Sequence, residues 1–216
     1  MRLVLLGPPG VGKGTQADLI AREFEIRHYS TGDIFRVILK GSSLLSKKLA
    51  KYLDVGELVP DDIVFETVKK TLSTYESSVN GWVLDGFPRN RNQAEMLDNL
   101  LNGNNHKLNF AIYLSADRDI LVERLSNRIV CYNCGAIYNL RMNTTKTEDI
   151  CEKCGGKLIQ RKDDERETIL KRIKIFENEF APLRQYYIDR GIFLKIGGEG
   201  EEKDVSNRIK ERLKSG

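Results

Sequence analysis

The chain has 216 residues, of which 40% are apolar, and its net charge of +4 at pH 7 comes with 31 acidic residues. This length suits one domain with a sizeable core, and the mixed charge argues against a general nucleic-acid surface. The N-terminus lacks a charged segment followed by a long apolar one. We therefore expect no signal peptide, no membrane span and a cytoplasmic protein.

Short apolar runs typical of buried strands recur along the chain. Helical patterns lie between them. In one, Ala17, Ile20 and Phe24 share a face; a longer one runs from Glu165 to Tyr187, where Pro182 predicts a kink or a restart. Alternating strands and helices predict an α/β fold with a doubly wound parallel sheet. The strands are expected at Leu3–Leu6, Trp82–Leu84, Phe110–Leu114 and Ile192–Ile196, with a short one at 28–30.

The first apolar run leads into a glycine-rich segment, residues 7–15, which reads Gly-Pro-Pro-Gly-Val-Gly-Lys-Gly-Thr. A glycine loop between a strand and a helix points backbone N–H groups at a phosphate, and the helix N-terminus adds its positive dipole end. Lys13 is expected to bind the β- and γ-phosphates, and Thr15 carries the hydroxyl needed for Mg²⁺, one position later than usual. A plain glycine turn is the alternative, which Lys13 disfavours.

A second motif, Val83-Leu84-Asp85-Gly86-Phe87-Pro88-Arg89, places a carboxylate at the end of an apolar strand. P-loop proteins hold a carboxylate near Mg²⁺ at such a position. We therefore predict that Asp85 contacts magnesium through water. Its alternative role is that of a helix cap or turn residue.

All four cysteines fall in one short stretch, as Cys131-x₂-Cys134 and Cys151-x₂-Cys154 with sixteen residues between the pairs. A glycine follows each pair and permits a tight turn around a metal. This spacing is typical of a four-thiolate zinc site, and four protein ligands make such a site structural rather than catalytic. Two disulfides are the alternative, which a cytosolic location disfavours.

Together these motifs resemble the adenylate kinase family, whose own P-loop variant is Gly-Lys-Gly-Thr. The resemblance runs over nearly the whole chain. It rests on Gly10-x-Gly12-Lys13-Gly14-Thr15, Ser30-Thr31-Gly32-Asp33, Asp85-Gly86-Phe87-Pro88-Arg89 and Arg161-x-Asp163-Asp164.

The resemblance implies reversible, Mg²⁺-dependent transfer of the terminal phosphoryl group from ATP to AMP, giving two ADP, in adenine nucleotide homeostasis. It also implies one structural Zn²⁺ and a monomer with neither nucleic-acid nor membrane partners. The implied P-loop core comprises residues 1–29, 61–123 and 164–216. Residues 30–60 would form an AMP-binding insertion and residues 124–163 a zinc-binding lid.

Site residues follow from the resemblance by position. ATP would be bound by Gly10, Val11, Gly12, Lys13, Gly14, Thr15, Arg128, Ile137, Tyr138 and Gly200. AMP would be bound by Thr31, Arg36, Glu57, Leu58, Val59, Gly86, Phe87, Pro88, Arg89, Gln93, Arg161 and Arg172. The catalytic charges would be Lys13, Arg89, Arg124, Arg161 and Arg172. Gly200 would contact the adenine through its backbone, in a segment where the family often has Asp-Gly-Thr-Lys and this chain has Gly-Gly-Glu-Gly.

This chemistry needs no general base, because an AMP phosphate is mostly a dianion at pH 7. Neither His28 nor His106 is therefore given a catalytic role. Three other functions are alternatives. One is a kinase for UMP, CMP or GMP. The second is a switch GTPase, for which the sequence lacks the Asn-Lys-x-Asp signature, and the third is a zinc-ribbon nucleic-acid binder, for which the cysteine pairs lack clustered basic and aromatic neighbours.

Overall fold

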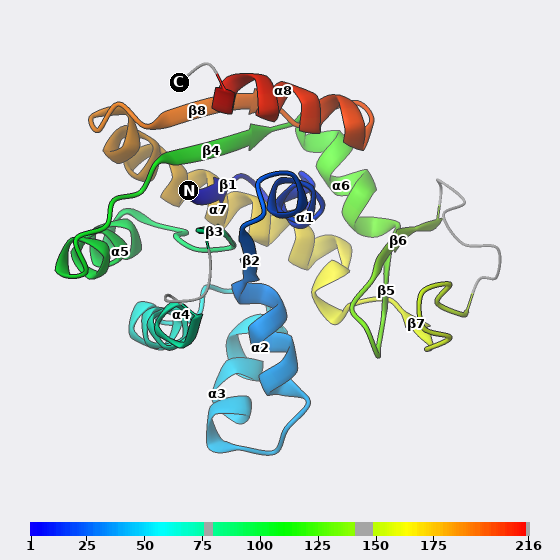
Figure 1. The fold of residues 1–216 in the computed structure, drawn as a ribbon. Coiled ribbons are helices and arrows are strands. Elements are labelled where there is room, and N and C mark those ends of the chain that lie inside the picture. The colour runs from blue at the N-terminus through cyan, green and yellow to red at the C-terminus, as the bar shows by residue number, and fades with distance from the viewer. Residues whose placement is uncertain (76–79, 141–148, 215–216) are drawn as a thin grey trace.

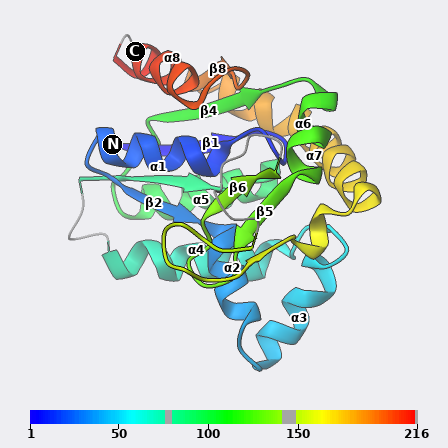
Figure 2. The ribbon, with the colours of Figure 1, turned by 90° about the vertical axis from the view of Figure 1, so that its right-hand side faces the viewer.

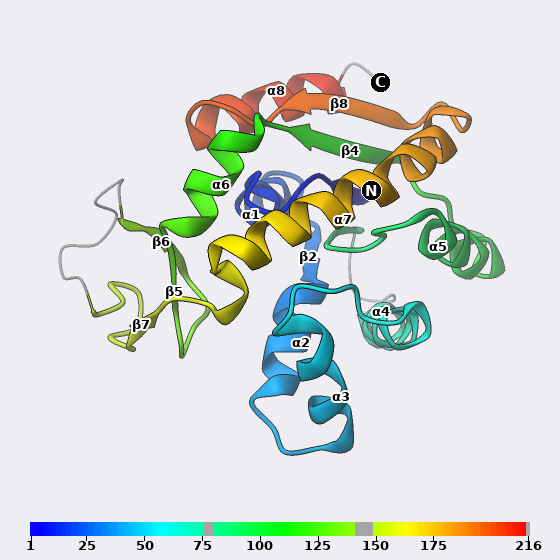
Figure 3. The same ribbon diagram turned by 180° about the vertical axis from the view of Figure 1, so that it is seen from behind.

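The computed structural model describes residues 1–75, 80–140 and 149–214. Within these residues the chain folds around a five-stranded parallel sheet with the order β2-β3-β1-β4-β8, and helices cover both faces (Figures 1 and 3). The predicted doubly wound α/β fold is therefore confirmed. The strands are β1 Arg2–Leu6, β2 Arg27–Ser30, β3 Trp82–Asp85, β4 Phe110–Ser115 and β8 Phe193–Gly197.

The helices include those expected from the apolar periodicity. They are α1 Lys13–Glu23, α2 Thr31–Leu39, α3 Leu44–Leu53, α4 Asp61–Tyr75, α5 Arg91–Gly103, α6 Arg118–Ser126, α7 Arg166–Ile188 and α8 Glu202–Lys214. None of the helices that the structure describes is both long and apolar enough to span a bilayer.

The middle strand β1 decides where a ligand can bind. It pairs with β3 on one side and β4 on the other, so the chain crosses from one half of the sheet to the other at this strand. In open parallel sheets, ligands bind beyond the carboxyl ends of the strands at such a switch point. The glycine-rich loop that follows Leu6 lies at this edge.

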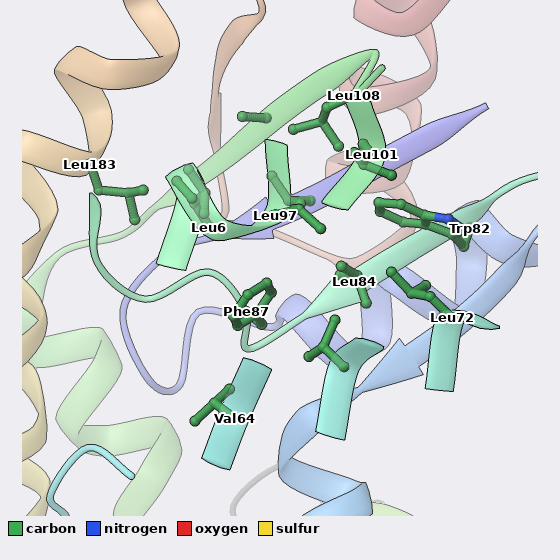
Figure 4. Packing of buried hydrophobic residues seen from close by; sticks show 14 of the residues in the cluster. Leu6, Val64, Leu72, Trp82, Leu84, Phe87, Leu97, Leu101, Leu108 and Leu183 are labelled. Carbon is green, nitrogen blue, oxygen red and sulfur yellow. The ribbon is translucent and has the colours of Figure 1, made fainter. Parts of the chain in front are cut away.

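Side-chain alternation along β1 supplies a separate core on each face. Val4 and Leu6 pack with α4, α5 and the C-terminal part of α7, whereas Leu3 and Leu5 pack with α1, α6, α8 and the N-terminal part of α7. Figure 4 shows the first of these cores, in which Phe87 lies among leucines from the sheet and the surrounding helices. Each fully buried large side chain contributes about 1.5–3 kcal/mol.

The helix α7 continues through Pro182 without a break. Of the two predictions for this proline, a kink or a restart of the helix, the restart is therefore wrong. Proline removes one backbone hydrogen bond from a helix interior. Next to it, Leu183 and Tyr187 are 1% and 0% exposed, and this packing holds the turn in helical geometry. Ile169 and Ile173 reach the opposite core, so α7 ties the two faces of the sheet together.

A small second sheet lies outside the main one. Its strands β5 Arg128–Cys131, β6 Ile137–Asn139 and β7 Leu158–Ile159 are antiparallel in the order β6-β5-β7. Figure 1 shows this sheet and the α2–α3 segment as two lobes outside the five-stranded sheet, and in Figure 2 the small sheet faces the viewer. Both lobes fall within the predicted insertions. Residues 141–148 of the predicted lid lie outside the described residues.

Candidate active site

The glycine-rich loop connects β1 to α1 and packs closely against α6. Gly10 has a φ of +85°, and a Cβ at this position would lie 2.8 Å from the Leu125 side chain, so only glycine fits. Lys13 begins α1, and its Nζ donates hydrogen bonds to the carbonyl oxygens of Gly7 at 2.7 Å and Pro8 at 3.0 Å. The ammonium thus lies over the loop that is predicted to hold phosphates.

The charges around Lys13 favour an anion. Burial lowers the pKa of Lys13 to about 8; the Asp85 carboxylate opposes this shift, and Arg89, Arg172 and Arg128 add to it. Burial likewise lowers the pKa of Arg89 and of Arg128. Cations from distant parts of the sequence therefore lie close together, and their mutual repulsion and loss of hydration cost free energy. A bound polyphosphate would offset that cost.

Asp85, which is predicted to contact magnesium through water, lies beside the first turn of α1. It ends β3 opposite Leu5 of β1, and its Oδ2 is 3.5 Å from the point where a Cβ of Gly14 would stand. Gly14 therefore leaves room for the carboxylate against the first turn of α1. The carbonyl oxygen of Asp85 accepts a hydrogen bond from Thr31 Oγ1 at 3.2 Å. A carboxylate next to a phosphate loop is a donor that Mg²⁺ prefers.

Three arginines converge on two aspartates in the 3-10 turn η3, Lys162–Asp164, just before α7. Arg161 binds the Asp163 carboxylate through Nε at 2.8 Å and Nη2 at 2.5 Å. Arg128 binds Asp164 in the same two-bonded way, at 2.8 and 2.6 Å. Arg172 Nη1 joins the pairs by donating to the Asp163 carbonyl at 2.8 Å and to Asp164 Oδ1 at 3.1 Å.

This network fixes the orientation of each guanidinium. The Asp164 side chain is fully buried. Burial raises the pKa of Asp163, but the stronger combined pull of Arg161 and Arg172 lowers it to about 2, so this carboxylate is ionised at neutral pH. Held by two bonds each, Arg128 and Arg161 have little rotational freedom to lose when a phosphate arrives.

One cavity of about 310 Å³ is lined by cationic side chains from four parts of the chain. Lys13 comes from the P-loop, Arg36 from α2, Arg89 from the loop after β3, and Arg161 and Arg172 from the two sides of η3. Apolar side chains complete the wall. The cavity is also lined by the predicted AMP residues Glu57, Leu58, Gly86 and Pro88.

Other residues predicted to contact AMP are buried behind this wall. Thr31 and Gln93 are each 1% exposed. The Gln93 amide is already engaged, because its Nε2 donates to Asp61 Oδ1 at 2.7 Å and its Oε1 accepts from the Arg89 backbone N–H at 2.8 Å. Val59 and Phe87 belong to the core. The predicted contact of Thr31 and Gln93 with the AMP base therefore stays a prediction.

The residues predicted to lie near the ATP adenine, and the predicted catalytic residue Arg124, are not part of the cavity wall either. Tyr138 is buried in the core of the small sheet, with its hydroxyl 3.2 Å from Cys151 Sγ, whereas its neighbour Ile137 is 55% exposed. Arg124, at the end of α6, donates to the carbonyl oxygen of Gly198 at 3.1 Å. The roles of these residues, and that of Gly200, stay predictions.

The four cysteine thiols form a compact cluster, and all of them are free. Their sulfur atoms lie within 4.8 Å of one another; Cys131 and Cys154 are 3.4 Å apart, and Cys134 and Cys151 are 3.6 Å apart. A tetrahedral site with zinc–sulfur bonds of about 2.3 Å separates its sulfurs by about 3.8 Å. The donor set and its spacing thus fit zinc.

Two turns of the same design present these thiols. In each, the glycine after the second cysteine donates its N–H to the carbonyl of the first: Gly135 to Cys131 at 3.0 Å, and Gly155 to Cys151 at 2.8 Å. Both glycines have a left-handed backbone conformation, with φ values of +74° and +69°. A side chain would strain this conformation.

Sequence reasoning assigned no role to Asp163, Asp164 or Arg208. The two aspartates could have been found from the sequence, since they belong to the motif Arg161-x-Asp163-Asp164. Arg208, which holds the loop beside Gly198, gave no such signal, because it lies in an otherwise ordinary polar pattern on α8.

The parallel sheet, the glycine loop and the convergent cations define a P-loop phosphotransferase. A profile of the adenylate kinase family matches residues 5–192. The adenylate kinase of Clostridium tetani is 43% identical over 213 residues, which are 99% of this chain and 98% of the relative. Those of Caldanaerobacter subterraneus and Ruminiclostridium cellulolyticum are each 45% identical over 99% of this chain, covering 96% and 99% of their own lengths. The chain belongs to the adenylate kinase family.

Proposed function

We propose that the protein transfers the terminal phosphoryl group of ATP reversibly to AMP, giving two ADP and so balancing the adenine nucleotides. The observation that carries this proposal is the cavity in which Lys13, Arg36, Arg89, Arg161 and Arg172 face one space. A nucleotide donor held at the P-loop and a monophosphate acceptor near Arg36 would bring their phosphates together there.

Charge neutralisation and alignment account for the chemistry. The two nucleotides together carry roughly six negative charges. Arginine suits their phosphates because its planar fork donates two parallel hydrogen bonds, and a dianionic acceptor needs no base. Holding the reacting oxygen in line with the phosphorus removes much of the entropic barrier.

We propose that Asp85 holds Mg²⁺ through water, and that the ion, when bound, offsets about two of the phosphate charges. Lys13 and the backbone N–H groups of residues 10–15 would then hold the β- and γ-phosphates. Arg124 and Arg128 would approach from the base of the lid, residues 124–163. Ile137, Tyr138 and Gly200 would surround the ATP adenine, and residues 30–60 would carry the AMP site.

We further propose that the four cysteines hold one structural Zn²⁺ and that the protein acts as a cytoplasmic monomer, with no nucleic-acid or membrane partner. Zinc would tie the two halves of the lid to each other. In the part of the lid that the structure describes, five side chains form the buried core and two of them are cysteines. With four thiolates as ligands, such an ion would keep no open position for a phosphate.

Acceptor choice is the first test. With Mg²⁺ and ATP, we expect AMP to be phosphorylated with a kcat/KM well above that of UMP, CMP or GMP, because Thr31 and Gln93 are the contacts proposed to select adenine in the acceptor. A coupled assay with this panel measures it. A higher kcat/KM for UMP or CMP would assign the protein to another nucleoside monophosphate kinase.

Closure of the two insertions is the second test. Lys40, directly after α2, donates to the carbonyl oxygen of Tyr132, next to Cys131, at 2.6 Å, so the two lobes are in contact. Single exposed contacts of this kind are weak, and the free protein should open and close. Two adenosines joined by five phosphates should hold it closed and exclude water. Small-angle scattering should then give a smaller radius of gyration; an unchanged value contradicts closure.

A further inference from the structure

The loop after β8, residues 197–200, packs directly on the P-loop. The N–H of Gly198 donates to the carbonyl oxygen of Ser115 at 2.7 Å. A Cβ on Gly198 would lie 2.8 Å from the Val11 side chain and 3.3 Å from the Val11 carbonyl oxygen. The backbone of this loop is therefore pressed against the segment that is proposed to hold the ATP phosphates.

Two guanidinium groups donate hydrogen bonds to three successive carbonyl oxygens of this loop. Arg208 of α8 donates from Nη1 to Gly197 at 2.7 Å and from Nη2 to Glu199, and its Nε donates to Asp204 within its own helix at 3.3 Å. Arg124 Nη1 donates to the carbonyl oxygen between these two, that of Gly198, at 3.1 Å. Within residues 1–75, 80–140 and 149–214, no hydrogen bond reaches the next carbonyl, that of Gly200.

We infer that Arg208 is a positioning residue for the phosphoryl donor: it orients this loop so that the Gly200 carbonyl stays free to accept a hydrogen bond from the exocyclic amino group of the donor base. The inference rests on the proposed function, in which the donor is a nucleoside triphosphate at the P-loop. The contact between Gly200 and adenine belongs to that proposed function, and the inference adds that Arg208 holds the loop in place for it. Adenine presents an amino donor there, whereas guanine presents a carbonyl acceptor, which the Gly200 oxygen would repel.

Arginine is suited to this task and lysine is not. A guanidinium has five N–H donors in a rigid plane, so it can bridge the carbonyls of residues 197 and 199 and its own helix at once. A lysine ammonium is a point charge on a flexible stem and cannot hold two carbonyls at a fixed separation. Arg208 itself touches no nucleotide in this scheme.

The test compares Arg208→Met and Arg208→Lys with the natural protein. We expect Arg208→Met to raise KM for ATP about tenfold and to lower the preference for ATP over GTP by a similar factor, while KM for AMP stays within twofold. Arg208→Lys should lie between the two. Lys210→Met is the matched control, because Lys210 lies on the same helix and pairs at 2.8 Å with Glu23, away from the loop. It should leave both KM values and the donor preference unchanged.

A role confined to stability would lower the melting temperature of Arg208→Met without altering the ratio of ATP to GTP use, and that result overturns the inference. An equal change in Lys210→Met also overturns it. Calorimetric titration with ATP alone separates the inference from the proposed function. A protein that uses another acceptor would still lose ATP affinity in Arg208→Met, whereas failure of the natural protein to phosphorylate AMP would contradict only the proposed function. If Arg208→Met does not fold, Arg208→Lys decides through the same ratio.

Discussion

Replacing Lys13 by methionine should lower kcat/KM for phosphoryl transfer by at least about two orders of magnitude and leave the fold intact. Methionine keeps the length and packing of the lysine stem and removes only the charge. In the proposed mechanism that charge acts on the transferring phosphoryl group, where its loss costs about 3 kcal/mol or more. Steady-state assays with ATP and AMP measure the effect.

An exposed lysine supplies the control for this variant. Lys107 precedes β4 and lies at the surface, so Lys107→Met should keep full activity. Because Lys13 is half-buried and its ammonium lowers stability where it has no anion, Lys13→Met should melt at the same temperature as the natural protein or higher. Near-normal turnover in a folded Lys13→Met protein would remove the P-loop from the mechanism.

Loss of the proposed zinc site should have the largest effect on stability. Serine at position 134 removes one thiolate, and we expect Cys134→Ser to lose the metal and to lower the melting temperature by at least about 5 °C. Well below that temperature, activity should survive, reduced only as far as Arg128 and Arg161 are held less firmly. Metal analysis, thermal melts and assays on the same samples test these points together.

Lys153→Ala is the control for this change, because it alters an exposed side chain of the second cysteine turn and leaves the four thiols in place. It should keep one zinc per chain. Two disulfides found by mass spectrometry in the native protein would rule out the metal. Complete loss of activity in a folded, zinc-free Cys134→Ser protein would mean that the metal does more than support the lid.

The parts of the site that depend on local sequence could be predicted. The apolar run of β1, the glycines after it and Lys13 are neighbours in the chain, so strand, loop and helix follow from composition and periodicity. The cysteine pairs are equally local, since each turn closes with a hydrogen bond within the motif. For these two motifs, the order of the residues along the chain largely determines the backbone geometry.

The contacts between distant segments could not be predicted in the same way. Periodicity shows that a side chain is buried but not which partner it meets, and so it did not reveal that Arg124 binds a loop after β8 or that Tyr138 turns into the core of the lid. Gln93 shows the same limit. The resemblance predicts that it contacts AMP, but no pattern in the sequence shows that its amide bonds to Asp61 and to the Arg89 backbone.

The fate of the terminal phosphate of ATP tests the central claim most directly. ATP labelled in its γ-phosphate is mixed with AMP, Mg²⁺ and the protein, and the labelled products are separated before equilibrium is reached. The account predicts that the label moves to the β-phosphate of ADP, with two ADP formed for each ATP consumed and almost no free phosphate. Label released as inorganic phosphate at the rate of ATP loss, with AMP unchanged, would contradict it.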